Sequence, residues 1–213
     1  MGERILSFDF PHRPLPRWRS VRAAFPLRGK GLALLLILLL AAPARAEVAP
    51  AEARRLAAAL EADLLAHASA TETLQRWCAA RHLADPPTIV AERVAGADKP
   101  ADAEVRGLLH AGPGEPVRYR RVALACGGRV LSNADNWYRP GQLTAAMNHE
   151  LDTTDHPFGL VVKPLGFHRR TLDAATPMTP GALIRNRAVL ETADGTPFSL
   201  VVESYTREVL SGY

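Results

Sequence analysis

The second half of the chain alternates apolar and polar residues, and this alternation predicts β-strands. Side chains in a strand point to opposite faces in turn, so a period of two marks a sheet with one buried face. The pair Gly127-Gly128 separates two such runs, which is a strong signal for a β-hairpin. The pattern predicts two hairpins and one short separate strand, over residues 117–138, 183–207 and 88–94.

Helices are predicted mainly before residue 110, where apolar residues recur at spacings of three and four. The segment Ser69-Ala-Thr-Glu72 has the form of a capping box, which marks the start of a helix. The helices expected cover residues 51–67, 69–82, 102–110 and 140–151, the last beginning at a proline. Early helices followed by paired strands predict a single α+β domain, an antiparallel sheet with flanking helices.

The first 46 residues have the pattern of a secretory signal. A long basic stretch ends at Lys30, an apolar run covers residues 31–42, and Ala44 and Ala46 give a small-x-small cleavage pattern. The run is shorter than the ~20 residues of a membrane span. We therefore expect a signal peptide over 1–46, a domain over 47–213 and an exported, periplasmic protein. If the signal is not cleaved, it anchors the protein in the membrane.

The basic charge of the chain belongs largely to this leader. Residues 1–46 hold eight of the 26 Lys and Arg residues and two of the 22 acidic residues, which leaves 18 basic and 20 acidic residues. A domain with this balance gives no electrostatic reason to expect binding to nucleic acid.

Two cysteines and a group of histidines raise other possibilities. Cys78 and Cys126 suit either one disulfide or two buried thiols, and their spacing matches no zinc or redox motif. His149-Glu150 and His156 lack the spacing of a helical zinc site. No metal site is expected.

Two charged residues fall on strand faces that the pattern assigns to the interior. Arg120 shares a face with Val122, and Glu203 shares one with Val201. A buried charge is costly unless a counter-ion or hydrogen bonds meet it. The two residues therefore either pair with each other, or face water, or line a pocket for a small anion.

Four segments, taken in order, resemble the chorismate pyruvate-lyase family. They are a Ser-Ala-Thr helix start, an arginine strand leading into a hairpin, a Pro-Phe-Gly turn, and a Gly-x-Pro strand that ends in glutamate; they occupy residues 69–71, 120–134, 157–159 and 195–203. The likeness spans roughly residues 56–208. It implies the chorismate lyase-like fold, in which an antiparallel sheet wraps around a buried aromatic ligand.

The resemblance also implies a site. Arg120 would hold the carboxylate of the ligand, Glu203 would meet its para oxygen, and the backbone amides of Ala70 and Phe158 would contact it. The reaction implied is removal of pyruvate from chorismate or a related enolpyruvyl compound, giving a 4-hydroxybenzoate-type product. Arg120 would orient the substrate and a protonated Glu203 would assist the leaving oxygen. No cofactor is expected, the partner is a small aromatic carboxylate, and a monomer is expected.

An alternative of another class follows from the leader and from changed residues in the expected pocket. Phe158 and Ala70 replace the leucine and methionine that the family has there. The chain would then be an exported, non-catalytic binding protein for a small aromatic carboxylate.

Overall fold

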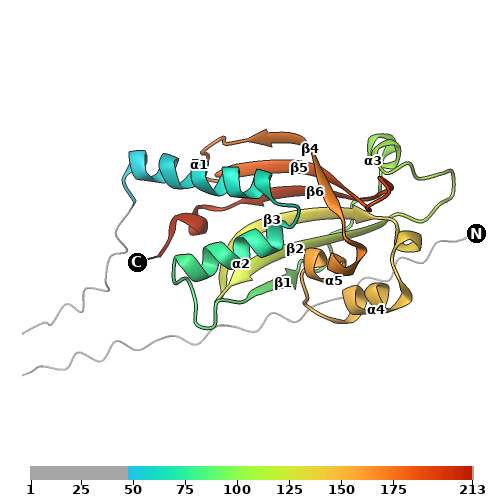
Figure 1. Ribbon diagram of the computed structural model, residues 1–213, viewed down its shortest axis with the longest axis horizontal. Coiled ribbons are helices and arrows are strands. Elements are labelled where there is room, and N and C mark those ends of the chain that lie inside the picture. Colours follow the sequence, from blue (N-terminus) through green and yellow to red (C-terminus); the bar gives the residue numbers. More distant parts are fainter. Residues whose placement is uncertain (1–47, 213) are drawn as a thin grey trace, which may run out of the picture. The chain divides into compact units, whose positions relative to one another are not determined.

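The hairpin around Gly127-Gly128 forms two neighbouring strands of a single antiparallel sheet (Figure 1). The computed structural model describes residues 48–212. Six strands lie in the order β1-β2-β3-β6-β5-β4, and every neighbouring pair is antiparallel. The strands are β1 (Ile89–Arg93), β2 (Arg118–Cys126), β3 (Arg129–Tyr138), β4 (His168–Ala175), β5 (Ile184–Glu191) and β6 (Pro197–Tyr205).

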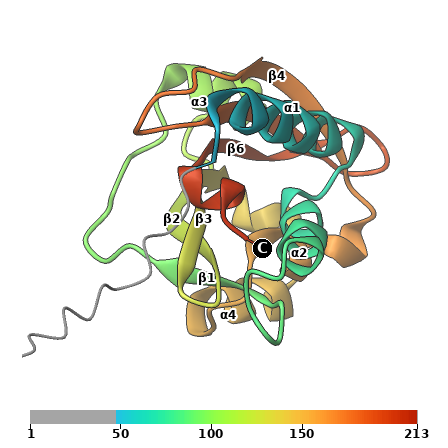
Figure 2. The ribbon, with the colours of Figure 1, turned by 90° about the vertical axis from the view of Figure 1, so that its left-hand side faces the viewer.

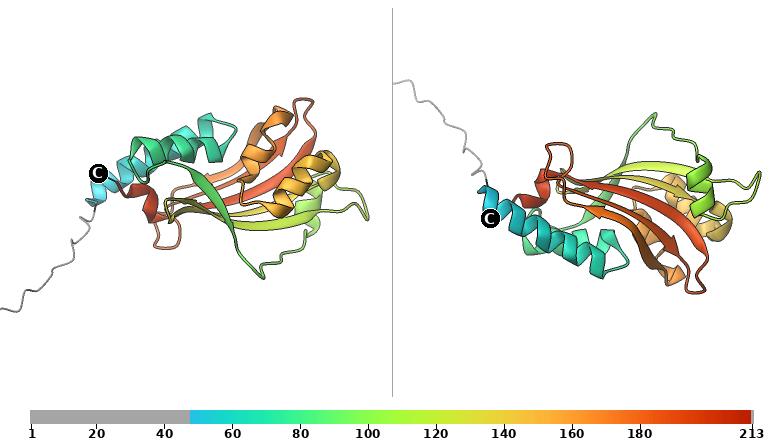
Figure 3. Two further views of the ribbon diagram at one scale, coloured as in Figure 1. Left: turned by 90° about the horizontal axis from the view of Figure 1, so that it is seen from below. Right: turned by 90° about the horizontal axis from the view of Figure 1, so that it is seen from above.

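Helices cover both faces of this sheet unequally. They are α1 (Pro50–Ala66), α2 (Ala70–Ala80), α3 (Ala103–Leu108), α4 (Ala145–Thr153) and α5 (Phe158–Val161), with the 3-10 turns η1 (Pro140–Gln142), η2 (Lys163–Leu165) and η3 (Arg207–Leu210). Figure 3 shows α1, α2, α4 and α5 on one face of the sheet and α3 on the other. We call the face under α1, α2, α4 and α5 the inner face.

The apolar residues of the helices pack against the inner face in two clusters. One contains Leu60 of α1, Leu74 of α2 and Tyr205 of β6, and the other contains Leu151 of α4 and Phe158 of α5. On the opposite face, α3 packs against a smaller cluster around the side chain of Trp137 in β3. The helices and the inner face of the sheet thus enclose the space in which the site lies.

The chain end is tied to α2. The 3-10 turn η3, red in Figure 2, lies beside α2, where the indole of Trp77 donates a hydrogen bond to the carbonyl of Val209 at 2.8 Å. The guanidinium of Arg81 donates to the carbonyl of Leu210, also at 2.8 Å. These contacts fix the C-terminal end of α2 against β6 and its continuation.

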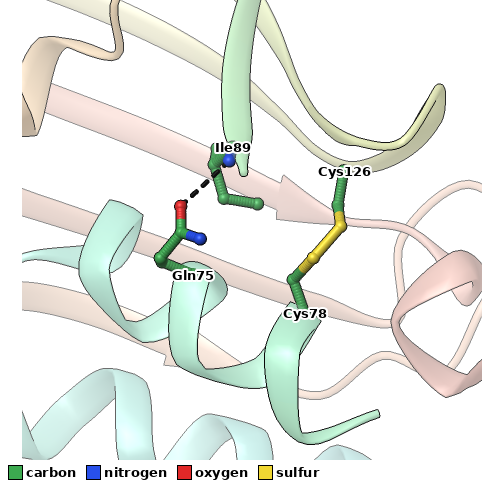
Figure 4. The surroundings of a disulfide bond; sticks show 4 residues. All are labelled: Gln75, Cys78, Ile89 and Cys126. Atoms are coloured by element: carbon green, nitrogen blue, oxygen red, sulfur yellow. Dashed lines mark hydrogen bonds between the residues drawn. A yellow bond between two sulfur atoms is a disulfide. The ribbon is translucent and has the colours of Figure 1, made fainter. Parts of the chain in front are cut away.

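A disulfide joins Cys78 of α2 to Cys126 at the end of β2, which resolves the alternative left open by the sequence (Figure 4). Next to it, the backbone N–H of Ile89 donates a hydrogen bond to the side chain of Gln75 at 2.9 Å. The two contacts hold α2 to both β1 and β2.

The predicted α+β class, the antiparallel sheet and both hairpins are confirmed. Two expectations were wrong. The helix expected over 140–151 is split, because Thr144 caps a new helix by accepting a hydrogen bond from the N–H of Met147. Strand β4 was not predicted, because its polar sequence and exposed position at the sheet edge hide the alternation.

The predicted signal segment, residues 1–46, lies outside the described residues and stays a prediction. Within residues 48–212, no helix is long and apolar enough to cross a membrane.

Candidate functional site

The inner face holds a cavity of about 50 Å³ between the sheet and the helices α2 and α5. All four residues expected at the site line it: Arg120, Glu203, Ala70 and Phe158. One water needs roughly 10–15 Å³ of such space, so the cavity has room for more than a single water. The structure thus brings together residues that lie more than 130 positions apart in the sequence.

Arg120 is a buried cation that has no carboxylate partner among residues 48–212. Its residue is 6% exposed, and its Nη2 donates one hydrogen bond, of 3.2 Å, to the carbonyl of His156. No acceptor among the described residues meets Nε or Nη1, although both atoms are buried. Burial, followed by the nearby charge of Arg93, lowers the pKa of Arg120 to about 10. The side chain therefore stays charged at neutral pH, at a cost that a bound anion would offset.

Asn136 of β3 lies directly opposite Arg120 and adds a second donor to the cavity wall. Its Oδ1 accepts a hydrogen bond from the hydroxyl of Ser199 at 2.5 Å, which orients the amide. Its Nδ2 is buried and meets no acceptor in the part of the chain that the structure describes. Arg120 and Asn136 together present three buried donors without acceptors on neighbouring strands.

The first turn of α2 forms another part of the wall. Ser69 caps the helix, and its hydroxyl accepts a hydrogen bond from the N–H of Glu72 at 3.2 Å. The first N–H groups of a helix have no acceptor within it and carry a partial positive charge. Gly159 of α5 lies so close that a Cβ there would come 3.1 Å from the hydroxyl of Thr71. The absence of a side chain at Gly159 allows α5 to approach this turn.

Glu203 does not pair with Arg120. Its Oε2 accepts a hydrogen bond from Nη2 of Arg169 in β4 at 2.6 Å, and the two side chains are 7% and 6% exposed. The same oxygen accepts a hydrogen bond from the hydroxyl of Tyr205 at 3.1 Å. Burial and then the neighbouring charge of Glu203 raise the pKa of Tyr205 well above its ordinary value. The predicted alternative of an Arg120–Glu203 pair is therefore wrong.

Arg169 was missed by sequence reasoning because it belongs to the strand that was not predicted. Burial alone lowers the pKa of Arg169, but the charge and the hydrogen bond of Glu203 raise it above its ordinary value. Arg169 also lines the cavity, which thus contains two arginines and one carboxylate. The side chains lining the cavity therefore carry a net charge of about +1.

The rest of the cavity wall is apolar. It includes Val122 of β2, Leu190 of β5, Val201 of β6 and the rings of Phe158 and Phe167. The rings of Phe158 and Tyr138 lie 5.4 Å apart, which fixes the orientation of the Phe158 side chain. A cavity with apolar walls and donors gathered at one side suits an organic molecule with one anionic group.

No protein-family model matches the chain. Among solved structures, the effector domain of PhnF from Mycobacterium smegmatis matches with 15% identity and a TM-score of 0.46, over 65% of this chain and 88% of that one. YydK from Bacillus subtilis, described as a possible transcriptional regulator, matches with 14% identity and a TM-score of 0.42, over 60% of this chain. This chain spans 62% of the length of YydK.

These findings correct the predicted function. The similar structures are regulators or their effector domains, which contradicts both the chorismate lyase and the exported binding protein that the sequence led us to expect. The catalytic roles expected for Glu203 and Arg120 stay untested predictions. The comparisons also give no support for a signal peptide or a periplasmic location.

The antiparallel sheet with a cavity on one face, which the resemblance implied, is present in the structure, but the chorismate pyruvate-lyase family is not shown. A relative in sequence is the protein y4mC from Sinorhizobium fredii, which is described as uncharacterized. The two are 50% identical over 174 residues, which cover 71% of this chain and 73% of that protein. Identity at this level over most of both chains leaves no doubt about common descent. The chain belongs to the family of y4mC.

Proposed function

We propose that the described domain is a small-molecule-binding module, and that its cavity holds an organic monoanion. The observation that carries the proposal is Arg120, a buried guanidinium whose Nε and Nη1 have no acceptor among residues 48–212. The carboxylate of the ligand would take the place of the missing counter-ion. Arginine suits this task because its fork of donors matches the two oxygens of a carboxylate.

The neighbouring donors support a carboxylate at the same position. Nδ2 of Asn136 lies on the adjacent strand at the register of Arg120, so both side chains reach the same part of the cavity. The net charge of about +1 on the cavity wall favours a monoanion over a dianion such as a phosphate ester. The apolar wall around Phe158 and Leu190 suits a hydrocarbon body, and we propose a single aromatic ring. At about 50 Å³ the cavity is smaller than such a ring needs, so its walls must move apart when the ligand binds.

The test compares benzoate with benzamide, which has the same shape and no charge. Isothermal titration calorimetry should show binding of benzoate and at least about tenfold weaker binding of benzamide, because only the anion compensates Arg120. The variant Arg120→Met should weaken benzoate binding at least about thirtyfold, the lower end for truncating one partner of a buried charge pair.

The matched control is Arg121→Met. Arg121 is the next residue on β2, is exposed, and pairs with Asp135 at 3.8 Å on the opposite face of the sheet. This variant removes the same charge and should bind benzoate like the unmodified protein. Equal affinities of the protein for benzoate and benzamide, or equal affinities of Arg120→Met and Arg121→Met for benzoate, would refute the proposal.

A further inference from the structure

A second hollow lies beside the cavity, and Arg120 lines both. It has a volume of about 230 Å³ and is bounded by Arg93 of β1, Arg118 of β2, Tyr138 of β3, and Leu151 and Asp152 of α4. We call it the outer groove. Because Arg120 lines both, this residue lies between the outer groove and the cavity.

The strand register places three arginines on the inner face at this point. Arg118 and Arg120 are two residues apart on β2 and therefore point to the same face. Arg93 pairs with Val122, the next β2 residue on that face, so Arg93 is the diagonal neighbour of Arg120. The arginines thus run from the exposed positions 93 and 118 to the buried position 120.

The acidic groups nearby do not pair with all three. Asp152 forms an ion pair with Arg118 at 2.9 Å, and Asp155 lies close enough to Arg120 to act on its charge. Arg93 has no ion pair with any residue in the described range. Like charges on neighbouring strands destabilise the fold. Two neighbouring cations, neither of them paired with a carboxylate in the described range, make this a favourable position for an anion.

The guanidinium of Arg120 is held to the loop between α4 and α5 by a hydrogen bond. The hydrogen bond runs from Nη2 of Arg120 to the carbonyl of His156 and is 3.2 Å long. His156 lies in the loop between α4 and α5. The same loop is fixed to β1 by a hydrogen bond of 2.8 Å from the N–H of Ala91 to the carbonyl of Asp155. The loop can therefore stay on the sheet while the guanidinium of Arg120 moves.

We propose that the outer groove is a second anion site, at which the carboxylate of the ligand first meets Arg93 and Arg118 before it passes to Arg120 in the cavity. The proposal rests on the proposed function for the nature of the ligand, a small organic monoanion. Its physical basis is that exposed cations at the mouth of a buried site raise the local concentration of an anion and the rate of its entry.

The first experiment reads the two sites separately. In NMR spectra of the protein, the Nε–H signals of Arg93, Arg118, Arg120 and Arg121 are followed during a titration with benzoate. The signals of Arg93 and Arg118 should shift and saturate, whereas that of Arg121, on the opposite face, should not. If neither Arg93 nor Arg118 shifts more than Arg121, the outer site does not exist. A shift of Arg93 and Arg118 without any shift of Arg120 would keep the outer site and refute the proposed function instead.

The second experiment measures the rate of entry. In stopped-flow binding of benzoate at low ionic strength, Arg93→Gln should lower the association rate constant about threefold and leave the dissociation rate constant unchanged. The difference should vanish at high salt, since screening removes the attraction of an exposed charge. Arg121→Gln is the matched control with the same change in charge. If Arg93→Gln and Arg121→Gln have the same association rate constant, the entry role is refuted.

Discussion

The charge of the buried Arg120 lowers the stability of the folded state. Its pKa of about 10 lies below its ordinary value because burial and the charge of Arg93 disfavour the charged form. One pKa unit corresponds to about 1.4 kcal/mol. We predict that Arg120→Met raises the free energy of unfolding by about 1–3 kcal/mol in urea titrations at low salt and neutral pH. The exposed Arg121→Met should change it by less than about 0.5 kcal/mol. A loss of stability in Arg120→Met would mean that the charge is compensated.

For the pair of Arg169 and Glu203 we expect the opposite result, so that removing one charge should destabilise the protein. Each side chain is buried, and each supplies the counter-charge of the other at 2.6 Å. We predict that Glu203→Leu costs about 3–5 kcal/mol of stability, because it leaves the charge of Arg169 buried without a partner. The double variant Arg169→Met with Glu203→Leu should cost less than either charge-removing single variant. Purely additive losses in this double-mutant cycle would show that the two charges are not coupled.

The sequence located the charged residues of the site but not their partners. Alternation alone placed Arg120 and Glu203 on the inner face, since parity within a strand needs no knowledge of its neighbours. A two-residue turn at Gly127-Gly128 would set Arg120 opposite Asp135. A bulge between Leu124 and Ala125 shifts the register by one residue, so the partner is Asn136. Sequence patterns do not reveal such a bulge, and the donor pair at the cavity was therefore missed.

At the scale of elements, the strand β4 shows a second limit of sequence reasoning. It lies at the edge of the sheet, and most of its residues are exposed, so its sequence carries no apolar alternation. Edge strands are commonly rich in charged residues, which prevents further pairing. The helices α1, α2 and α3 and the other strands were predictable because each has one buried face, whereas the short helix α5 was expected to be a turn. Only the fold shows that β4 supplies Arg169 to the site.

Helix α2 depends on its disulfide for its position over the sheet. The bond between Cys78 and Cys126 closes a loop of 48 residues. The first turn of α2 lines the cavity. Loop-entropy models give about 4 kcal/mol for a loop of this length, and measured values are typically about 2–4 kcal/mol. We predict that the double variant Cys78→Ser with Cys126→Ser is about 2–4 kcal/mol less stable in urea titrations.

The control for this prediction is a reducing agent. Dithiothreitol should lower the stability of the unmodified protein towards that of the double serine variant and should leave the variant unchanged. If the unmodified protein is equally stable with and without reductant, the disulfide does not contribute to the free energy of unfolding.

At the scale of the whole molecule, the cavity connects most elements of the domain. Its lining comes from α2, α5 and the strands β2, β3, β4, β5 and β6, so a bound ligand contacts both halves of the sheet and two of its helices. A ligand that binds only the folded state adds about 2.7 kcal/mol at one hundred times its dissociation constant. For a domain of this size, each kcal/mol shifts the melting temperature by about 2–4 °C. We therefore predict that saturating benzoate raises the melting temperature by about 5–10 °C near neutral pH.

This ligand-induced stabilisation should depend on pH in one direction. Benzoate stays ionised from neutral to high pH, so the group that changes is Arg120, whose charged form binds the anion. Since its pKa in the free protein is about 10, the charged fraction is complete at neutral pH and falls as the pH rises through that value. The shift in melting temperature caused by benzoate should be constant up to about pH 9 and should decline above about pH 10. Arg121→Met should follow the same profile, and Arg120→Met should show a much smaller benzoate shift that does not change with pH. A benzoate shift that persists unchanged well above pH 10 would mean that the charge of Arg120 does not hold the ligand.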